Sequence, residues 1–372
     1  MKYRKLGRTG LEIGEIGLGL EHLLPKEQAV VTETIQAAIK GGVNYLDCLS
    51  MKEFEKSSGT NEDFVKLGKA LEGCRDKVYL SHIANPLHSV EDIEIGFECF
   101  LRELNTDYTD IFMIACCDKT DLFEEIINGG LLEYVQKLQS AKKVKFIGLS
   151  THSLNIAHKA IDSSCFDVLM YPVNPAFDVI DNEEEYIEQD LGKLWDAAFD
   201  YKPGDGLKLR RKDIYAECVK NNIGLVAMKP FGGGFLFRAD VNSGFTAVNL
   251  VSYALNQTGV SSVVPGCTSK DEIENILTYY SASEEDRDYG KIIAQSRWNI
   301  KGCCQYCNHC LPCSANINIG RINKLMDSGM IQEYNLLEVK ASACTECGEC
   351  ETRCPFGVKI KDKMKAAANL FE

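Results

Sequence analysis

Eight cysteines near the carboxyl end of the chain are the residues whose spacing points most directly to chemistry. The first run, C-x2-C-x2-C-x2-C, consists of Cys304, Cys307, Cys310 and Cys313. The second run, C-x2-C-x2-C-x3-C, consists of Cys344, Cys347, Cys350 and Cys354 and is followed by Pro355. Such runs are typical of chains that hold two [4Fe-4S] clusters, in which the last cysteine of each run binds the other cluster. We therefore predict crossed ligation, with one cluster on Cys304, Cys307, Cys310 and Cys354 and the other on Cys344, Cys347, Cys350 and Cys313.

A pair of zinc sites is the alternative interpretation of these cysteines. Tetrahedral zinc usually takes two C-x2-C pairs separated by a long loop, whereas these runs hold four cysteines at nearly constant spacing. The pattern therefore favours iron–sulfur clusters. Cys303 lies directly before the first run, but only Cys304 keeps the two-residue spacing to Cys307, so Cys303 is predicted to lie outside the ligand set.

The other cysteines and the charge balance indicate a cytosolic protein. Nine of the 17 cysteines are scattered between positions 48 and 303, and the basic N-terminus lacks the apolar core of a signal peptide, so we expect reduced thiols. Lys and Arg total 41 against 54 Asp and Glu, and the formal charge of -13 repels nucleic acid and anionic lipid. No apolar run reaches the roughly 18 residues of a membrane span. We predict a cytoplasmic protein of an anaerobic cell, with neither nucleic acid nor membrane as a partner.

Short apolar runs alternate with amphipathic runs after an N-terminal hairpin-like segment. The candidate strands are GEIGLGL (14–20), VNYLDC (43–48), VYLSHI (78–83), DIFMIA (110–115), KFIGLS (145–150), FDVLMY (166–171), IGLVAM (223–228) and VSSVVPG (260–266). Helical patterns such as 26–40 and 62–71 separate them, which favours parallel strands joined by crossovers. Eight such units predict a (β/α)8 TIM barrel. A doubly wound sheet would need an early G-x-G-x-x-G turn, which this sequence lacks.

Two domains fit the length of 372 residues better than one. We predict a barrel over residues 1–285, followed over residues 286–372 by a small α-helical, ferredoxin-like domain that holds the two clusters. An acidic segment at 178–209 interrupts the barrel pattern. We interpret this segment as a surface insertion beside the barrel mouth.

Several segments resemble the aldo-keto reductase family. They are YRKLGRTGLEIGEIGLG, GGVNYLDC, KFIGLSTHS, AMKPFGGGFL and VVPGCTSKDEIENIL, and their order spans nearly the whole chain. The cysteine-rich tail resembles the branch of this family that ends in a ferredoxin-like domain. The resemblance implies a (β/α)8 barrel with its site at the carboxyl ends of the strands.

The family reduces carbonyl compounds with nicotinamide hydride, using a tyrosine as general acid together with an aspartate, a lysine and a histidine. The resemblance makes Asp47 the aspartate, whereas the other three positions fall on Lys52, Ile83 and Ala115. Without a positioned acid and cation, the alkoxide charge of carbonyl reduction lacks stabilisation. We therefore do not expect ordinary carbonyl reduction, and a structural role for Asp47 stays open.

Other reactive side chains fall at the predicted strand ends, namely Cys48, Lys52, His82, Cys116, Cys117, His152, Tyr171 and Cys267. Our candidate catalytic residues are Asp47, Lys52, His82, Cys116 and His152. In this hypothesis Lys52 or His82 supplies protons, and a cysteine acts as nucleophile or metal ligand. A third metal centre at Cys116-Cys117-Asp118 is a further hypothesis. The alternative for each single cysteine is a small buried hydrophobic side chain.

The resemblance also implies a site for a nicotinamide dinucleotide. Its residues would be Ser150, Lys229, Gly232, Gly233, Gly266, Thr268, Ser269 and Lys270, with backbone amides and a helix start facing the phosphates. Family members that prefer NADPH place an arginine near Glu274, but Lys270 is the only basic residue of segment 265–275. A preference for NADPH is therefore not expected. The glycines at 232–234 have a second interpretation, a tight turn that requires glycine.

Three functions remain in view. The first is an iron–sulfur oxidoreductase in which two [4Fe-4S] clusters exchange electrons with a small molecule at the barrel mouth, with NAD(P)H as an open second cofactor. The second is a non-catalytic electron-transfer or scaffold subunit that docks a redox protein partner. The third, ranked last, is an ordinary NAD(P)H-dependent aldo-keto reductase.

Overall fold

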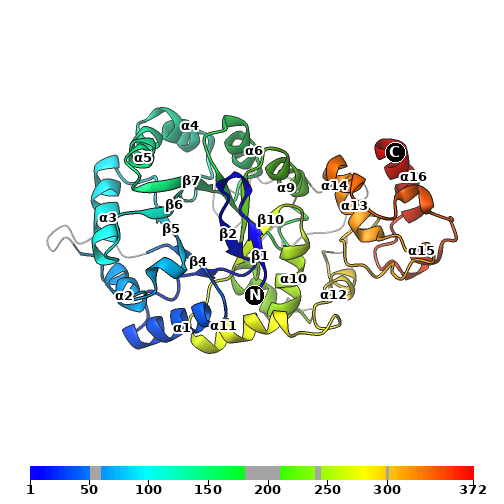
Figure 1. Ribbon diagram of the computed structural model, residues 1–372, viewed down its shortest axis with the longest axis horizontal. Coiled ribbons are helices and arrows are strands. Elements are labelled where there is room, and N and C mark those ends of the chain that lie inside the picture. Colours follow the sequence, from blue (N-terminus) through cyan, green and yellow to red (C-terminus); the bar gives the residue numbers. More distant parts are fainter. Residues whose placement is uncertain (51–59, 181–209, 239–243, 299–300) are drawn as a thin grey trace.

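Eight parallel strands form a closed barrel at the centre of the computed structural model, which describes every residue except 51–59, 181–209, 239–243 and 299–300 (Figure 1). The strands are β3 (Leu18–Gly19), β4 (Tyr45–Cys48), β5 (Tyr79–Ala84), β6 (Thr109–Ile114), β7 (Val144–Ser150), β8 (Val168–Pro172), β9 (Gly224–Met228) and β10 (Val260–Val264). They pair in chain order, and parallel bridges from Ile16 to Val263 and from Gly19 to Gly266 close the ring. Each predicted strand overlaps one of them, so the predicted (β/α)8 barrel is confirmed.

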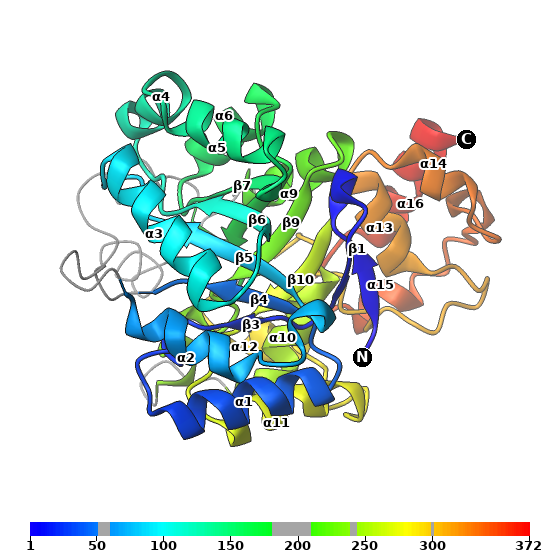
Figure 2. The same ribbon diagram turned by 60° about the vertical axis from the view of Figure 1, so that its left-hand side comes forward.

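Helices surround the barrel (Figures 1 and 2). They are α1 (Gln28–Lys40), α2 (Glu62–Ala70), α3 (Val90–Glu103), α4 (Thr120–Asn128), α5 (Leu131–Ser140), α6 (Leu154–Ser163), α9 (Arg210–Lys220), α10 (Ala247–Asn256) and α11 (Lys270–Leu277). Asn61, Ser89 and Ser153 cap α2, α3 and α6 by accepting hydrogen bonds from first-turn amides. These caps satisfy amides that helix geometry leaves without a partner, which explains where the helices begin.

Side chains alternate between the two faces of each strand, so the barrel has an inner and an outer core. The inner core includes Tyr45, Ile83, Ile111, Met113 and Ala115. The outer core, between strands and helices, includes Leu46, Cys48, Leu80, Phe112 and Ile114. The position of a residue along its strand therefore decides whether its side chain can reach the barrel interior.

An antiparallel hairpin of β1 (Tyr3–Lys5) and β2 (Glu12–Gly14) closes the amino end of the barrel. Leu6 and Ile13 of this hairpin belong to the inner core. Gly7 has a φ of +48°, and a Cβ there would lie 2.2 Å from the backbone nitrogen of Gly224. Only glycine allows this close approach, and the hairpin expected from the sequence is confirmed.

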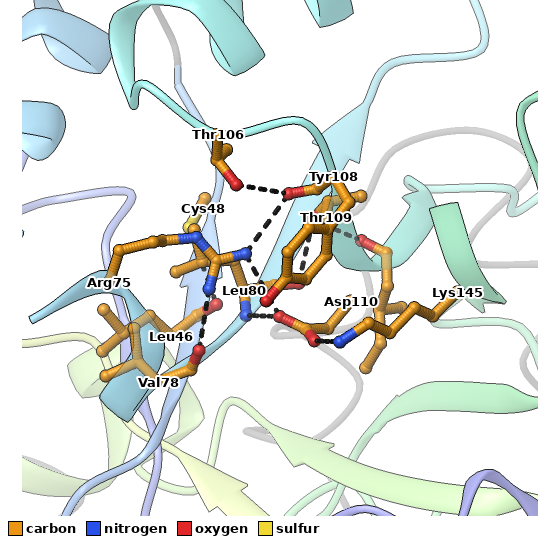
Figure 3. Close-up of polar contacts among 11 residues, drawn as sticks. Leu46, Cys48, Arg75, Val78, Leu80, Thr106, Tyr108, Thr109, Asp110 and Lys145 are labelled. Atoms are coloured by element: carbon orange, nitrogen blue, oxygen red, sulfur yellow. Dashed lines mark hydrogen bonds and ion pairs between the residues drawn. The ribbon is translucent and has the colours of Figure 1, made fainter. Parts of the chain in front are cut away.

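A buried ion cluster joins the amino ends of β5, β6 and β7 (Figure 3). Asp110 is 1% exposed and accepts hydrogen bonds from the amide of Leu80 (3.0 Å), from Lys145 (2.8 Å) and from Arg75 (3.4 Å). The ring of Tyr108 lies 4.9 Å from the Arg75 guanidinium and 4.1 Å from Lys145 Nζ. Since the amino end of such a barrel contributes to stability and not to catalysis, this cluster is structural.

The cysteine-rich tail contains the short helices α13 (Ile319–Asp327), α14 (Ile331–Asn335), α15 (Glu349–Arg353) and α16 (Ile360–Phe371). The tail lies at the side of the barrel formed by α9 and α10 (Figure 1). Lys324 Nζ donates to the backbone oxygens of Asn256 (2.7 Å) and Gln257 (3.2 Å), which joins α13 to the end of α10. The boundary at residue 285 and the ferredoxin-like character of the tail stay predictions.

Two further expectations concern the acidic segment at 178–209 and membrane-spanning helices. Most of the acidic insertion, at 181–209, lies outside the described residues. None of the helices in the described ranges combines the length and the apolar character that a bilayer span requires.

Candidate functional site: the barrel mouth and two cysteine recesses

Asp47 lies at the carboxyl end of β4 and faces the barrel interior. It pairs in register with Gly19 of β3 and Ser81 of β5. Its side chain is buried, and neither its Oδ1 atom nor Ser81 Oγ has a hydrogen-bond partner among the described residues. Ile83 and Ala115 also face this interior. Burial raises the pKa of Asp47 to about 8, against a small opposing effect of the Ser81 hydroxyl.

This raised pKa predicts a pH-dependent stability. The folded state holds the Asp47 proton up to about pH 8, whereas the unfolded chain releases it near 3.8. Stability from this group is therefore complete at low pH and declines by about 1.4 kcal/mol per pH unit between these values. We expect the thermal midpoint of Asp47→Asn to rise relative to wild type between pH 5 and 8. The exposed control Asp107→Asn should follow wild type, and parallel curves for Asp47→Asn would contradict the prediction.

His152 and Asp118 form a buried pair after β7 and β6 respectively. His152 Nδ1 lies 3.0 Å from Asp118 Oδ2, and Asp118 Oδ1 accepts from the His152 amide (2.6 Å) and the Thr151 hydroxyl (3.0 Å). His152 Nε2 is buried without a hydrogen-bond partner among the described residues. Burial lowers the pKa of His152 and outweighs the opposing effect of Asp118. A neutral imidazole that donates from Nδ1 leaves Nε2 as a proton acceptor.

The thiols near the mouth are not nucleophiles at neutral pH. The Cys116 amide donates a hydrogen bond to Ser150 Oγ (3.0 Å), and the residue is exposed to solvent. Desolvation of its thiol by the surrounding atoms, together with the charge of Asp118, raises the pKa of Cys116 to about 11. Burial likewise raises the pKa of Cys117 and of Cys267 to about 12. Because the thiolate is the reactive form, the expected cysteine nucleophile is not supported.

A third metal centre at Cys116-Cys117-Asp118 gains no support either. No three His, Cys, Asp or Glu side chains in the described ranges converge on a position for one metal ion. Cys117 and Cys267 are buried in the outer core. They fit the alternative of small hydrophobic side chains.

The prediction that His82 supplies protons at the mouth is wrong. His82 is the next residue along β5 after Ser81, so its side chain points outward into the helix layer. Its ring lies 4.5 Å from the ring of Phe100 and between 5.2 and 5.9 Å from three other phenylalanine rings, and burial lowers its pKa to about 3. Cys48 and Tyr171 also belong to the outer core, whereas Lys52 lies outside the described residues.

The glycine loop after β9 is a strained turn. Lys229 has a φ of 50°, and Gly232 and Gly233 have φ values of 60° and 58°. Glycine adopts such angles without steric cost, so the interpretation as a tight turn is confirmed. The backbone oxygen of Lys229 accepts a hydrogen bond from Asn174 Nδ2 (3.0 Å). This bond fixes the start of the loop at the barrel mouth.

The loop before α11 satisfies its donors internally. Glu272 Oε2 accepts hydrogen bonds from the amide of Thr268 (2.6 Å) and from its hydroxyl (3.0 Å), while Ser269 caps the helix. Lys270 Nζ pairs with Glu33 of α1 at 3.1 Å. Gly266 lies beside Gly19 at the closure of the barrel. A carboxylate therefore sits where the resemblance places a ligand phosphate.

The eight cysteines of the two runs surround two recesses in the tail. The recess that we call the barrel-side recess is lined by Cys304, Cys307, Cys310 and Cys354. The outer recess is lined by Cys313, Cys344, Cys347 and Cys350. Each recess thus takes three cysteines from one run and one from the other, which is the grouping that crossed ligation requires.

Sequence reasoning missed the polar groups around these recesses. Asn323 Nδ2 donates to Cys304 Sγ at 3.6 Å, and Lys212 of α9 donates to the backbone oxygen of Cys304 at 3.4 Å. Neither residue lies within a cysteine run, so the spacing gave no signal for them. The sequence suggests Asp118 only as a metal ligand. Its hydrogen bond with His152 depends on the adjacent ends of β6 and β7, which the sequence does not show.

Comparisons with known sequences match the barrel. Residues 13–188 match the model of the aldo/keto reductase family. The chain is 26% identical over 205 residues to aldo-keto reductase YhdN of Bacillus subtilis, covering 50% of this chain and 56% of the relative. It is 25% identical over 177 residues to the uncharacterized oxidoreductase YqkF of the same organism, covering 44% and 53%. The chain thus spans about half the length of the curated relatives it matches.

Solved structures share the fold at low identity. Aldo-keto reductase AKR11C1 from Bacillus halodurans, in its holo form, has a TM-score of 0.56 and 17% identity, covering 81% of this chain and 98% of that one. An aldo-keto reductase from Klebsiella pneumoniae in complex with NADPH has a TM-score of 0.56 and 16% identity, covering 80% and 95%. Likeness at this level establishes the barrel fold.

Proposed function

We propose that the protein is an oxidoreductase of the aldo/keto reductase family, whose model matches residues 13–188, and that its barrel acts on a small molecule while its tail carries two [4Fe-4S] clusters. The observation that carries the proposal is the grouping of eight cysteines around two recesses. Besides four cysteines each, the linings include apolar side chains, with His309 at the barrel-side recess and Glu349 at the outer recess. In this proposal the protein also binds a redox protein partner and a small-molecule substrate.

The arrangement of the thiols favours clusters over zinc. Zinc needs four donors that converge on one atom, and no three such donors converge in the described part of the chain. In a [4Fe-4S] cluster each thiolate binds a separate iron, so the four sulfurs surround a volume. When bound, the clusters would supply one-electron transfer at low potential.

The residues at the barrel mouth support proton transfer by a different set from that of the family. We infer that the lysine and histidine roles are vacant, because Ile83 and Ala115 offer only apolar side chains to the interior. The Asp118–His152 pair supplies an alternative. Asp118 orients the imidazole through Nδ1, and Nε2 takes or returns the substrate proton.

A nicotinamide dinucleotide is the second cofactor of the proposal. The relative from Klebsiella pneumoniae is in complex with NADPH, and in this proposal Ser150, Lys229, Gly232, Gly233 and the loop from Gly266 to Lys270 would hold the dinucleotide. In this chain Glu272 already binds Thr268, and Lys270 is paired with Glu33. The segment therefore presents carboxylates where NADPH carries its additional phosphate.

We predict that NADH binds at least roughly tenfold more tightly than NADPH, a difference of about 1.4 kcal/mol. The reason is the repulsion between the additional phosphate and Glu272. Anaerobic fluorescence titration of the reconstituted protein measures both affinities. Glu272→Arg should reduce the difference, whereas Glu133→Arg on the surface of α5 should leave it unchanged. Equal affinities in the wild-type protein would disprove the preference.

An ordinary NAD(P)H-dependent aldo-keto reductase is the second candidate. Sequence reasoning ranks this function last, yet the comparisons support it better than they support cluster-linked electron transfer, because they match aldo-keto reductases and no iron–sulfur protein is among those described above. The retained Asp47 and the barrel fold favour it. The apolar side chains at the lysine and histidine positions argue against it.

One anaerobic experiment separates these functions. The reconstituted protein is titrated with NADH and NADPH while visible absorbance reports the clusters and fluorescence reports the nucleotide. Nucleotide binding with bleaching of the cluster absorbance supports the proposal. Carbonyl reduction that continues at full rate in protein without iron supports the ordinary reductase. No nucleotide binding, together with a stably bound protein partner, supports the non-catalytic subunit.

A further inference from the structure

Lys212 reaches from the barrel into the first cysteine run. Its Nζ atom donates to the backbone oxygen of Cys304 (3.4 Å) and to the side-chain oxygen of Gln305 (3.2 Å). It also lies 4.7 Å from the centre of the Tyr306 ring. These three residues are consecutive and begin with a cysteine of the barrel-side recess. Helix α9 of the barrel therefore places a cation beside this recess.

The carboxylates of Asp178 and Asp327 act electrostatically on Lys212, but neither forms an ion pair with it. Asp178 accepts short hydrogen bonds from two tyrosine hydroxyls, at 2.6 and 2.5 Å. Asp327 pairs with Lys363 at 2.7 Å. An ammonium that has lost most of its water needs an opposite charge nearby. Four thiolates around the barrel-side recess would supply that charge.

Asn323 places a second donor at the same cysteine. Its Nδ2 atom lies 3.6 Å from Cys304 Sγ, and its side chain is 1% exposed. Its Oδ1 atom has no hydrogen-bond partner among the described residues. Hydrogen bonds to the sulfur ligands of a cluster and positive charge nearby raise its reduction potential, because the reduced state carries more negative charge.

The outer recess differs in its charges. The cations in its lining are Lys361 and Arg353, and each faces a carboxylate. Lys361 lies 3.8 Å from Glu351, and Arg353 lies 3.9 Å from Glu349. Cys347 of this recess is also exposed to solvent. Each of these two cations therefore has a carboxylate within 4 Å, whereas Lys212 forms no ion pair with a carboxylate of the described residues.

We propose that Lys212, assisted by Asn323, holds the reduction potential of the barrel-side cluster above that of the outer cluster and so directs electrons toward the barrel. The inference rests on the proposed function, because it requires both clusters. One electron moves from the outer to the barrel-side cluster, so that the first is oxidised and the second reduced, without a proton or a bond being exchanged. The electron donor at the outer cluster is a low-potential one-electron carrier.

The same helix turn also contacts the barrel mouth. Arg211, the residue before Lys212, donates to the backbone oxygen of His152 at 3.1 Å. Two consecutive residues of α9 therefore connect the Asp118–His152 pair with the barrel-side recess.

Lys212→Gln tests the proposal, because glutamine can keep a hydrogen bond but carries no charge. The full-length protein is reconstituted anaerobically, and EPR-monitored redox titration gives the two midpoints. We expect Lys212→Gln to move the higher midpoint to a more negative potential and to leave the lower midpoint in place. Lys212→Arg should keep the wild-type midpoints, and Lys361→Gln should move only the lower one.

Several outcomes would overturn the inference. Two results with Lys212→Gln would contradict it, namely unchanged midpoints or a shift of the lower midpoint alone. If Lys212→Gln does not bind iron, Asn323→Leu is measured instead. This variant removes only the hydrogen-bond donor to Cys304, and the inference requires that it also lowers the higher midpoint. Wild-type protein without iron and sulfide would instead reject the proposed function, so the two failures are distinguishable.

Discussion

Cys354→Ala is expected to remove the cluster whose other three ligands lie in the first cysteine run. Cys354 lines the barrel-side recess with Cys304, Cys307 and Cys310. Three thiolates and an alanine leave one iron without a protein ligand, so we expect the iron content to fall from about eight to about four atoms per chain. Iron and acid-labile sulfide analysis of anaerobically reconstituted protein measures the loss.

A double variant distinguishes crossed from uncrossed ligation. If Cys310 and Cys354 bind the same cluster, then Cys310→Ala combined with Cys354→Ala should still retain about four irons. If each run binds its own cluster, the double variant loses both. Cys303→Ala is the matched control, because Cys303 adjoins the first run but does not line either recess. Its iron content should equal that of wild type.

Asp110→Ala should destabilise the barrel by about 3 kcal/mol, since removal of one partner from a buried ion cluster leaves the others without compensation. The substitution removes the acceptor for the Leu80 amide and the counter-charge of Arg75 and Lys145 (Figure 3). The value is at the low end of the usual range because the Lys145 side chain is 43% exposed and can regain water. Anaerobic denaturant unfolding measures the change.

Asp110→Asn and a surface variant complete this test. Asn keeps an acceptor for Leu80 but loses the charge, so its loss of stability should be smaller than that of Ala. Glu133→Ala breaks an exposed pair with Lys137 and should change stability little. Because Asp110 lies at the amino end of the barrel, nucleotide affinity at low temperature should stay unchanged. A loss of nucleotide binding in a fully folded variant would contradict the structural role.

The barrel could be predicted because each strand–helix unit is a local pattern. The run VNYLDC and the following helix, capped by Asn61, show their periodicity within a few residues. Closure follows from the number of units, since eight right-handed crossovers bring the last strand beside the first. The grouping of the cysteines around two recesses could be predicted for a similar reason, because it follows from their spacing within each run.

The candidate site could be predicted only in part. Asp47 and Cys116 lie at strand ends as expected, but His82 does not face the mouth, because adjacent residues of a strand point to opposite faces. In the register between β4 and β5, Asp47 pairs with Ser81. Ser81 therefore faces the barrel interior, and the next residue, His82, faces the helix layer. The register between strands decides this parity, and register is a tertiary property.

Residue patterns alone were enough to predict the eight-unit barrel and to identify the two cysteine runs. Each of these follows from residue types at short spacing. The contacts of His152 with Asp118 and of Lys212 with Cys304 are visible only in the folded protein. These contacts join segments far apart in the chain, and long-range packing selects them because burial of a polar group is tolerated only where a partner is supplied.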